Sequence, residues 1–204
     1  MTAILENSVQ PAGTHLQPLP PPQNLMTSPL MSALWARRST RAYSGAQLEP
    51  QVLSDLLWAA CGVNRRATMD RTVPYWRHRM VLDVYVATAG GVWIYDPEHH
   101  GLLQHQTIDI RAETGTQDFV STAPVNLIYV AHGERMGDLM GVERRLYASV
   151  DTAFIGQNVY LFCATQGLAT VFRGALDTEA LGRTLGLGTD QFVTFAQTVG
   201  YPQL

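Results

Sequence analysis

The sequence predicts an α+β fold in which a central, mostly antiparallel sheet packs against a buried hydrophobic helix and flanking helices. Two observations carry this prediction. Segments with helical spacing of apolar residues occur along the same chain as short strand-like runs bounded by Gly, Pro and Asp turn signals. The 204 residues are enough for one sizeable core, and no internal repeat is visible. We therefore expect a single domain over 28–204.

Four segments are predicted to be helical. Apolar residues share one face over 29–35, and a second helix begins at Pro50 and ends at Gly62. The longest helical pattern spans 139–165. Its second half is apolar on nearly every side, so we expect a buried central helix there. Asp177 begins the last helix.

Six short runs have strand character. The first alternates between apolar and polar side chains, and two more follow it after turn signals, which is the pattern of an antiparallel meander. The predicted strands cover 80–86, 92–95, 102–108, 125–130, 169–172 and 192–199. The arginine-rich segment 63–78 has no clear periodicity and is predicted to be irregular.

The N-terminal segment 1–27 has a different composition. It contains five prolines and little periodicity. Such a composition is typical of a flexible arm, which could also drape over a partner. No basic stretch followed by an apolar run marks a signal peptide, and no apolar run reaches membrane-spanning length. We therefore expect a cytoplasmic protein without a membrane partner.

Composition excludes several classes of function. The net charge of −3 argues against nucleic acid as the main partner. Cys61 and Cys163 both lie in apolar helical patterns, so we expect buried free thiols rather than a disulfide. Histidines at 99, 100 and 105 follow no ligand spacing, so we expect a solvated loop and no metal site.

The clearest functional signal is Arg37-Arg38-Ser39-Thr40-Arg41, which directly follows the first predicted helix. Guanidinium groups offer planar forks of donors that fit a phosphate, and the serine adds a hydroxyl. The chain has no lysine, and eight of its 14 basic residues fall between 37 and 79. A bound phosphorylated cofactor would explain this clustering, and a solvated basic turn is the alternative.

Further motifs follow in a fixed order. They are Arg37-Arg38-Ser39-Thr40-Arg41-Ala42-Tyr43, the run from Leu53 to Arg65, Leu82-Asp83-Val84-Tyr85-Val86, Gly91-Val92-Trp93-Ile94-Tyr95-Asp96-Pro97, Gly156-Gln157-Asn158-Val159-Tyr160-Leu161, Gly167-Leu168-Ala169-Thr170-Val171 and Val199-Gly200-Tyr201-Pro202. Together, over about residues 30–202, they resemble the nitroreductase-like FMN flavoprotein family. The compact branch that includes the azoline (peptide) dehydrogenases is the most similar.

The resemblance implies an FMN-dependent oxidoreductase that forms a homodimer with the flavin at the subunit boundary. The residues that would hold the cofactor are Arg37, Arg38, Ser39, Arg41, Asn64, Arg173 and Gly174. The arginine cluster and serine would bind the phosphate and ribityl chain. Gly174 would let the backbone approach the ring. NADH or NADPH would be the reductant, the substrate would be a small molecule or peptide-derived, and no side chain need act as a catalytic nucleophile.

One departure from the family pattern bears on the function. Compact members carry a Pro-Ser-Ala-Gly-like run where this chain has Pro74-Tyr75-Trp76-Arg77-His78. Tyr75, Trp76 and His78 either face the substrate or pack against the partner subunit. The chain also ends at Leu204, where longer relatives carry a further basic residue. The second hypothesis is therefore a non-catalytic or flavin-free partner protein with this fold in a biosynthetic assembly.

Overall fold

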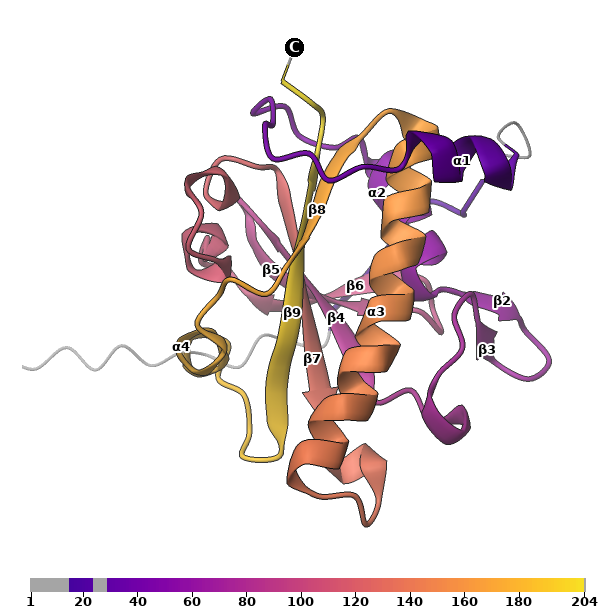
Figure 1. The fold of residues 1–204 in the computed structure, drawn as a ribbon, viewed down its shortest axis with the longest axis vertical. Helices are drawn as coiled ribbons and strands as arrows, with labels where there is room; N and C mark the ends of the chain where they lie inside the picture. The colour runs from indigo at the N-terminus through magenta and orange to yellow at the C-terminus, as the bar shows by residue number, and fades with distance from the viewer. Residues whose placement is uncertain (1–14, 24–28, 204) are drawn as a thin grey trace, which may run out of the picture.

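One seven-stranded sheet forms the centre of the molecule (Figure 1). This computed structural model describes residues 15–23 and 29–203. The strand order is β1-β6-β5-β4-β7-β9-β8, and every neighbouring pair is antiparallel. The strands are β1 (Leu16–Pro18), β4 (Leu82–Thr88), β5 (Gly91–Asp96), β6 (Gly101–Gln106), β7 (Val125–His132), β8 (Ala169–Arg173) and β9 (Gln191–Gly200). The predicted α+β class with an antiparallel sheet is confirmed.

Four helices accompany the sheet: α1 (Leu30–Ala36), α2 (Pro50–Cys61), α3 (Gly141–Gln166) and α4 (Thr178–Thr184). Their ends follow the sequence signals. The Asp177 carboxylate accepts hydrogen bonds from two backbone N–H groups at the start of α4. Gly167 ends α3 in the left-handed region at φ 66°. No helix in the described part of the chain is long and apolar enough to cross a membrane.

The helix α3 lies across one face of the sheet, and α1 and α2 pack against it (Figure 1). The predicted burial holds for the side that faces the sheet, where Ile155, Gly156 and Val159 are buried. The opposite side is open to solvent in the single chain, and Phe154 is 42% exposed there. This difference arises because one sheet can cover only one side of a helix.

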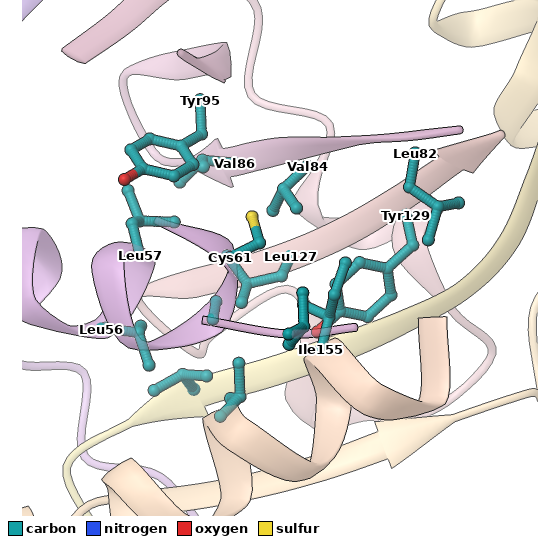
Figure 2. Packing of buried hydrophobic residues seen from close by; sticks show 14 of the residues in the cluster. Leu56, Leu57, Cys61, Leu82, Val84, Val86, Tyr95, Leu127, Tyr129 and Ile155 are labelled. Atoms are coloured by element: carbon teal, nitrogen blue, oxygen red, sulfur yellow. The ribbon is translucent and has the colours of Figure 1, made fainter. Parts of the chain in front are cut away.

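The main hydrophobic core lies between α2, α3 and the sheet (Figure 2). Its labelled members are Leu56, Leu57, Cys61, Leu82, Val84, Val86, Tyr95, Leu127, Tyr129 and Ile155. A smaller core on the other face of the sheet includes Leu181 and Leu185 at α4. Cys61 and Cys163 are buried free thiols, as predicted, and burial raises the pKa of Cys61 to about 12.

Residues 63–78 were predicted to be irregular, but they contain a short hairpin of β2 (Val63–Arg65) and β3 (Asp70–Arg71). The Asp70 carboxylate holds this hairpin together. It accepts hydrogen bonds from the Thr68 hydroxyl at 2.7 Å, the Tyr75 hydroxyl at 2.9 Å and the Arg65 guanidinium at 3.2 Å. These bonds lower the pKa of Asp70 to about 2, and the bond from Thr68 contributes most.

Part of the N-terminal segment is bound to the domain. β1 pairs with the edge strand β6, the Ser54 hydroxyl donates to the Pro20 carbonyl at 2.5 Å, and the Gln23 N–H donates to Asp55 at 2.7 Å. This corrects the prediction of a flexible arm for residues 15–23. Proline lacks an N–H but keeps its carbonyl acceptor, and α2 supplies the donor. The rest of the predicted arm, 1–14 and 24–27, lies outside the described residues.

A charged cluster joins β4 to the end of β7. Asp83 accepts two hydrogen bonds from the Arg135 guanidinium, at 2.7 and 3.1 Å. It also lies 2.7 Å from Nε2 of buried His132, in an ion-pair contact that is not aligned as a hydrogen bond. Burial alone would raise the pKa of Asp83, but His132 and Arg135 lower it to about 2.

The variant Asp83→Asn is expected to lower the free energy of unfolding at pH 7 by about 1–3 kcal/mol, because it removes a charge-assisted acceptor. A carboxylate with a lowered folded pKa contributes stability that is present above its unfolded pKa and is lost as the pH falls through the folded pKa. The difference in free energy of unfolding between parent and variant should therefore shrink as the pH falls from about 4 towards about 2. Urea unfolding of both proteins at pH 7, 4 and 3 measures this difference. The exposed Asp138→Asn is the control, and a pH-independent deficit for Asp83→Asn would contradict the assignment.

Candidate cofactor site

The basic loop after α1 is tied to the ends of β8 and β9. The Thr40 N–H donates to the Thr170 carbonyl at 2.9 Å, and the Ser44 N–H donates to the Tyr201 carbonyl at 2.9 Å. The buried Tyr43 ring lies between these anchors, and its hydroxyl donates to the Thr40 carbonyl at 2.7 Å. These bonds hold the loop against the sheet while its arginine side chains remain outside the core.

Two of the predicted cofactor residues meet at Tyr160 on α3. The Ser39 Oγ lies 2.7 Å from the Tyr160 hydroxyl, and the Arg37 guanidinium lies 5.2 Å from the centre of the Tyr160 ring. The same hydroxyl accepts a hydrogen bond from the Phe172 N–H of β8 at 2.9 Å. Sequence reasoning missed Tyr160 as a site residue. It had identified the segment Gly156–Leu161 as a motif, but not the direction of this side chain.

The remaining arginines of the loop, Arg38 and Arg41, are exposed. A cavity of about 300 Å³ opens beside the loop, and its lining includes Arg38, Thr40, Tyr160 and Thr170. None of the ion pairs between described residues involves Arg37, Arg38 or Arg41. The loop therefore presents three guanidinium groups, free of carboxylate partners in the described part of the chain, to an anion from solution.

Arg173 is buried, unlike the arginines of the basic loop. Its side chain is 4% exposed and points into the protein rather than towards the basic loop. The guanidinium donates to the Thr114 carbonyl at 2.7 Å, Thr198 Oγ1 at 2.9 Å and Asn126 Oδ1 at 3.1 Å. Burial lowers the pKa of Arg173 to about 10. The guanidinium is therefore bound to interior acceptors, and a contact between Arg173 and the cofactor stays a prediction. The next residue, Gly174, is exposed, with its backbone beside Phe195.

The second group of predicted site residues lies elsewhere. Asn64 is exposed on β2, and Tyr75 is held by the hydrogen bond to Asp70. The Trp76 N–H donates to the buried Asp151 carboxylate of α3 at 3.0 Å, while the Trp76 ring lies 5.7 Å from the Tyr147 ring. His78 is exposed.

The structure does not bring the two groups together within one chain. The basic loop meets α3 at Tyr160, and the Trp76 turn meets it at Asp151. Nine residues of helix separate these contacts, which corresponds to about 14 Å along the axis. The basic loop and the Trp76 turn therefore contact α3 at two separate points of the same chain.

The histidines considered in the sequence have separate partners. His99 contacts Asp96 at 2.7 Å, His100 lies between Ser54 and Tyr95, and His105 bonds the Leu185 carbonyl at 2.8 Å. No group of three metal-binding side chains occurs within residues 15–23 and 29–203.

The variant Arg173→Met is expected to lower the free energy of unfolding by about 3 kcal/mol, because three buried acceptors lose their donor. Chemical unfolding measures this, with the exposed Arg183→Met as control and a change below about 0.5 kcal/mol expected there. Equal stability of both variants would contradict the structural role of Arg173.

Comparison with known proteins identifies the family. The family model described as Nitroreductase family matches residues 34–201. A predicted nitroreductase of Methanocaldococcus jannaschii is 32% identical over 156 residues, which are 72% of this chain and 78% of that protein. The crystal structure of a predicted nitroreductase from Ralstonia eutropha is 38% identical, with a TM-score of 0.88 over 96% of this chain and 94% of that chain.

Two structures of lower identity share the fold. One is the Escherichia coli microcin synthetase McbBCD complex with truncated pro-MccB17 bound, at 17% identity and TM-score 0.70 over 79% of this chain and 67% of that chain. The other is the NADPH:FMN oxidoreductase of Vibrio harveyi complexed with NAD+, at 19% identity and TM-score 0.65 over 86% of this chain and 69% of that chain. On the family match and the close relatives, this chain belongs to the nitroreductase family.

Proposed function

We propose that this protein is an FMN-dependent oxidoreductase that transfers hydride or electrons between a nicotinamide donor and an organic substrate. One observation carries the proposal: Arg37, Arg38, Ser39 and Arg41 lie on one anchored loop, and their three cations have no carboxylate partner among the described residues. A phosphate dianion supplies the counter-charge that this loop lacks.

The residues present fit FMN in chemistry as well as in charge. The arginines and the Ser39 hydroxyl suit the phosphate, the Thr40 hydroxyl suits the ribityl chain, and the exposed backbone at Gly174 suits the edge of a planar ring. When bound, FMN supplies hydride or electron transfer. The chain's own residues orient it, and none of the predicted site residues needs to act as a nucleophile.

The nicotinamide donor is supported by a relative of the same fold. The Vibrio harveyi protein is an NADPH:FMN oxidoreductase whose structure contains NAD+. We extend that donor class, NADH or NADPH, to this chain as part of the proposal.

We further propose that the working unit is a homodimer with the cofactor between subunits. An apolar surface of α1 and α3 remains open in the single chain, and Trp35 is 87% exposed. Its members are Leu30, Met31, Leu34, Trp35, Val142, Leu146, Val150 and Phe154. Exposed apolar side chains along two neighbouring helices are typical of a subunit interface. Asn64 and the Trp76 turn would then complete the cofactor site of the partner subunit.

Within that dimer, Trp76 and His78 would face the substrate. Tyr75 is less free to move, because its hydroxyl is bonded to Asp70. The substrate class is a small organic molecule or a peptide-derived intermediate. The similarity in fold to a microcin synthetase complex that contains a peptide precursor supports the second class.

The alternative function is a flavin-free or non-catalytic partner in a biosynthetic assembly. The bulk of Tyr75 and Trp76, where the family pattern has small residues, favours it. The two functions differ in one measurement, because purified protein that rejects added FMN supports the alternative only.

Replacing Arg37 or Arg41 with alanine is expected to weaken FMN binding about tenfold or more, because one charge-assisted phosphate contact is lost. Fluorescence titration of the apoprotein with FMN measures the dissociation constant. The exposed Arg183→Ala, on α4, is the matched control and should bind like the parent. Equal affinity in all three variants would contradict the assignment of the basic loop.

Light scattering at micromolar concentration is expected to report about 45 kDa, twice the 22.5 kDa of the chain. A charge in the apolar surface should disrupt the dimer, because its burial is unfavourable without a partner. Phe154→Glu should therefore report 22.5 kDa, whereas Gln104→Glu, on the exposed side of β6, should remain dimeric. A monomeric parent protein would end the dimer proposal.

Trp76→Ala is expected to retain FMN and to accept larger electron acceptors, because it removes an aromatic ring but leaves the backbone bond to Asp151 possible. Rates with a series of nitroaromatic acceptors of increasing size measure the change, and Trp76→Phe should be intermediate. An unchanged acceptor range would place this ring away from the substrate.

A further inference from the structure

Tyr160 joins three parts of the candidate site through one side chain. Its hydroxyl contacts Ser39 on the basic loop and the Phe172 N–H on β8, and its ring lies under the Arg37 guanidinium.

The groups involved fix the direction of one of these two hydrogen bonds. A backbone N–H can only donate, so the Tyr160 oxygen is the acceptor in its 2.9 Å bond with Phe172. The single Tyr160 proton is then free for another acceptor. Within the described residues the only acceptor at bonding distance is Ser39 Oγ, at 2.7 Å. Either hydroxyl can donate in this contact; with Tyr160 as the donor, the Ser39 proton is left to point to a ligand.

We infer that Tyr160 is a positioning residue for the phosphate of the cofactor. It accepts from Phe172, donates to Ser39, and so turns the Ser39 hydroxyl into a donor towards an anion on the basic loop. The inference rests on the proposed function, since it assumes that the phosphate of FMN binds at this loop. Arg37 is held in the same place by the Tyr160 ring, at a distance of 5.2 Å that suits a cation–π contact.

The position of Tyr160 is itself well determined. Gly156, one helical turn earlier, brings α3 so close to the sheet that an added Cβ would meet the Phe172 ring at 2.6 Å. This close approach fixes the distance between Tyr160 and β8. The hydrogen bond from the Thr40 N–H to the Thr170 carbonyl, at 2.9 Å, holds the basic loop against β8. The Phe172 N–H is therefore fixed by the strand, and Thr40, the residue after Ser39, is fixed by its backbone bond to Thr170.

The test compares FMN with riboflavin, which has the same ring and ribityl chain but no phosphate. Tyr160→Phe keeps the ring under Arg37 and removes only the hydroxyl. We expect the dissociation constant of FMN to rise about tenfold and that of riboflavin to change by less than about twofold. A general loosening of the fold would weaken both ligands equally, so an unchanged ratio of the two constants overturns the inference.

Two further variants complete the test. Ser39→Ala should lose the same preference for FMN, and adding Tyr160→Phe to it should cause no further loss, because both residues act through one hydroxyl. If Tyr160→Phe fails to fold, Ser39→Ala decides alone, and equal weakening of FMN and riboflavin overturns the inference. Tyr95→Phe is the control for loss of a buried tyrosine hydroxyl. A parent protein that binds no FMN would instead refute the proposed function itself.

Discussion

The close approach of α3 to the sheet at Gly156 is the constraint on which the rest of the structure depends. An added Cβ there would overlap the Phe172 ring and press on Gln197. The glycine leaves its carbonyl open to the Gln197 amide at 3.3 Å, and Gln197 in turn accepts from the Tyr129 hydroxyl at 2.8 Å. A buried polar network thus fixes the helix over β7 and β9 at one height. Since α1 and α2 pack on α3, their positions depend on the same contact.

The helix α3 also fixes the distance between the two groups of predicted site residues, the basic loop and the Trp76 turn. Tyr160 holds the basic loop on one side of Gly156, and Asp151 holds the Trp76 turn on the other. A rigid helix cannot shorten to bring these points together. The spacing of about 14 Å between the Arg37 loop and the Trp76 turn is therefore fixed by the helix. In the proposed dimer, a second copy would pack on the open apolar side of α3 and bring its own Trp76 turn to the site.

Local sequence signals made most of the fold predictable. Contacts between residues distant in sequence, and the directions of the side chains that make them, could not be predicted in this way. Pro50, Asp177 and Gly167 act on the backbone beside them, so the ends of three helices could be predicted from the sequence. β1 is only three residues long and contains a proline, and it exists because an edge strand distant in sequence accepts it. The direction of Arg173 was missed for a related reason. Adjacent strand residues face opposite sides of a sheet, so a motif ending in exposed Gly174 says little about the preceding side chain.

Arg173 nevertheless bears on the candidate site through its charge. Its three partners are neutral acceptors, and none of its ion-pair or hydrogen-bond partners in the described part of the chain is a carboxylate. The field reaches the basic loop: burial raises the pKa of Tyr43, whereas the charge of Arg173 acts in the opposite direction by favouring the anionic phenolate. In the proposed function, the arginines of the loop would provide the contacts to the bound anion. The buried Arg173 would add a positive potential behind them, weakly screened because it lies in the low-dielectric interior.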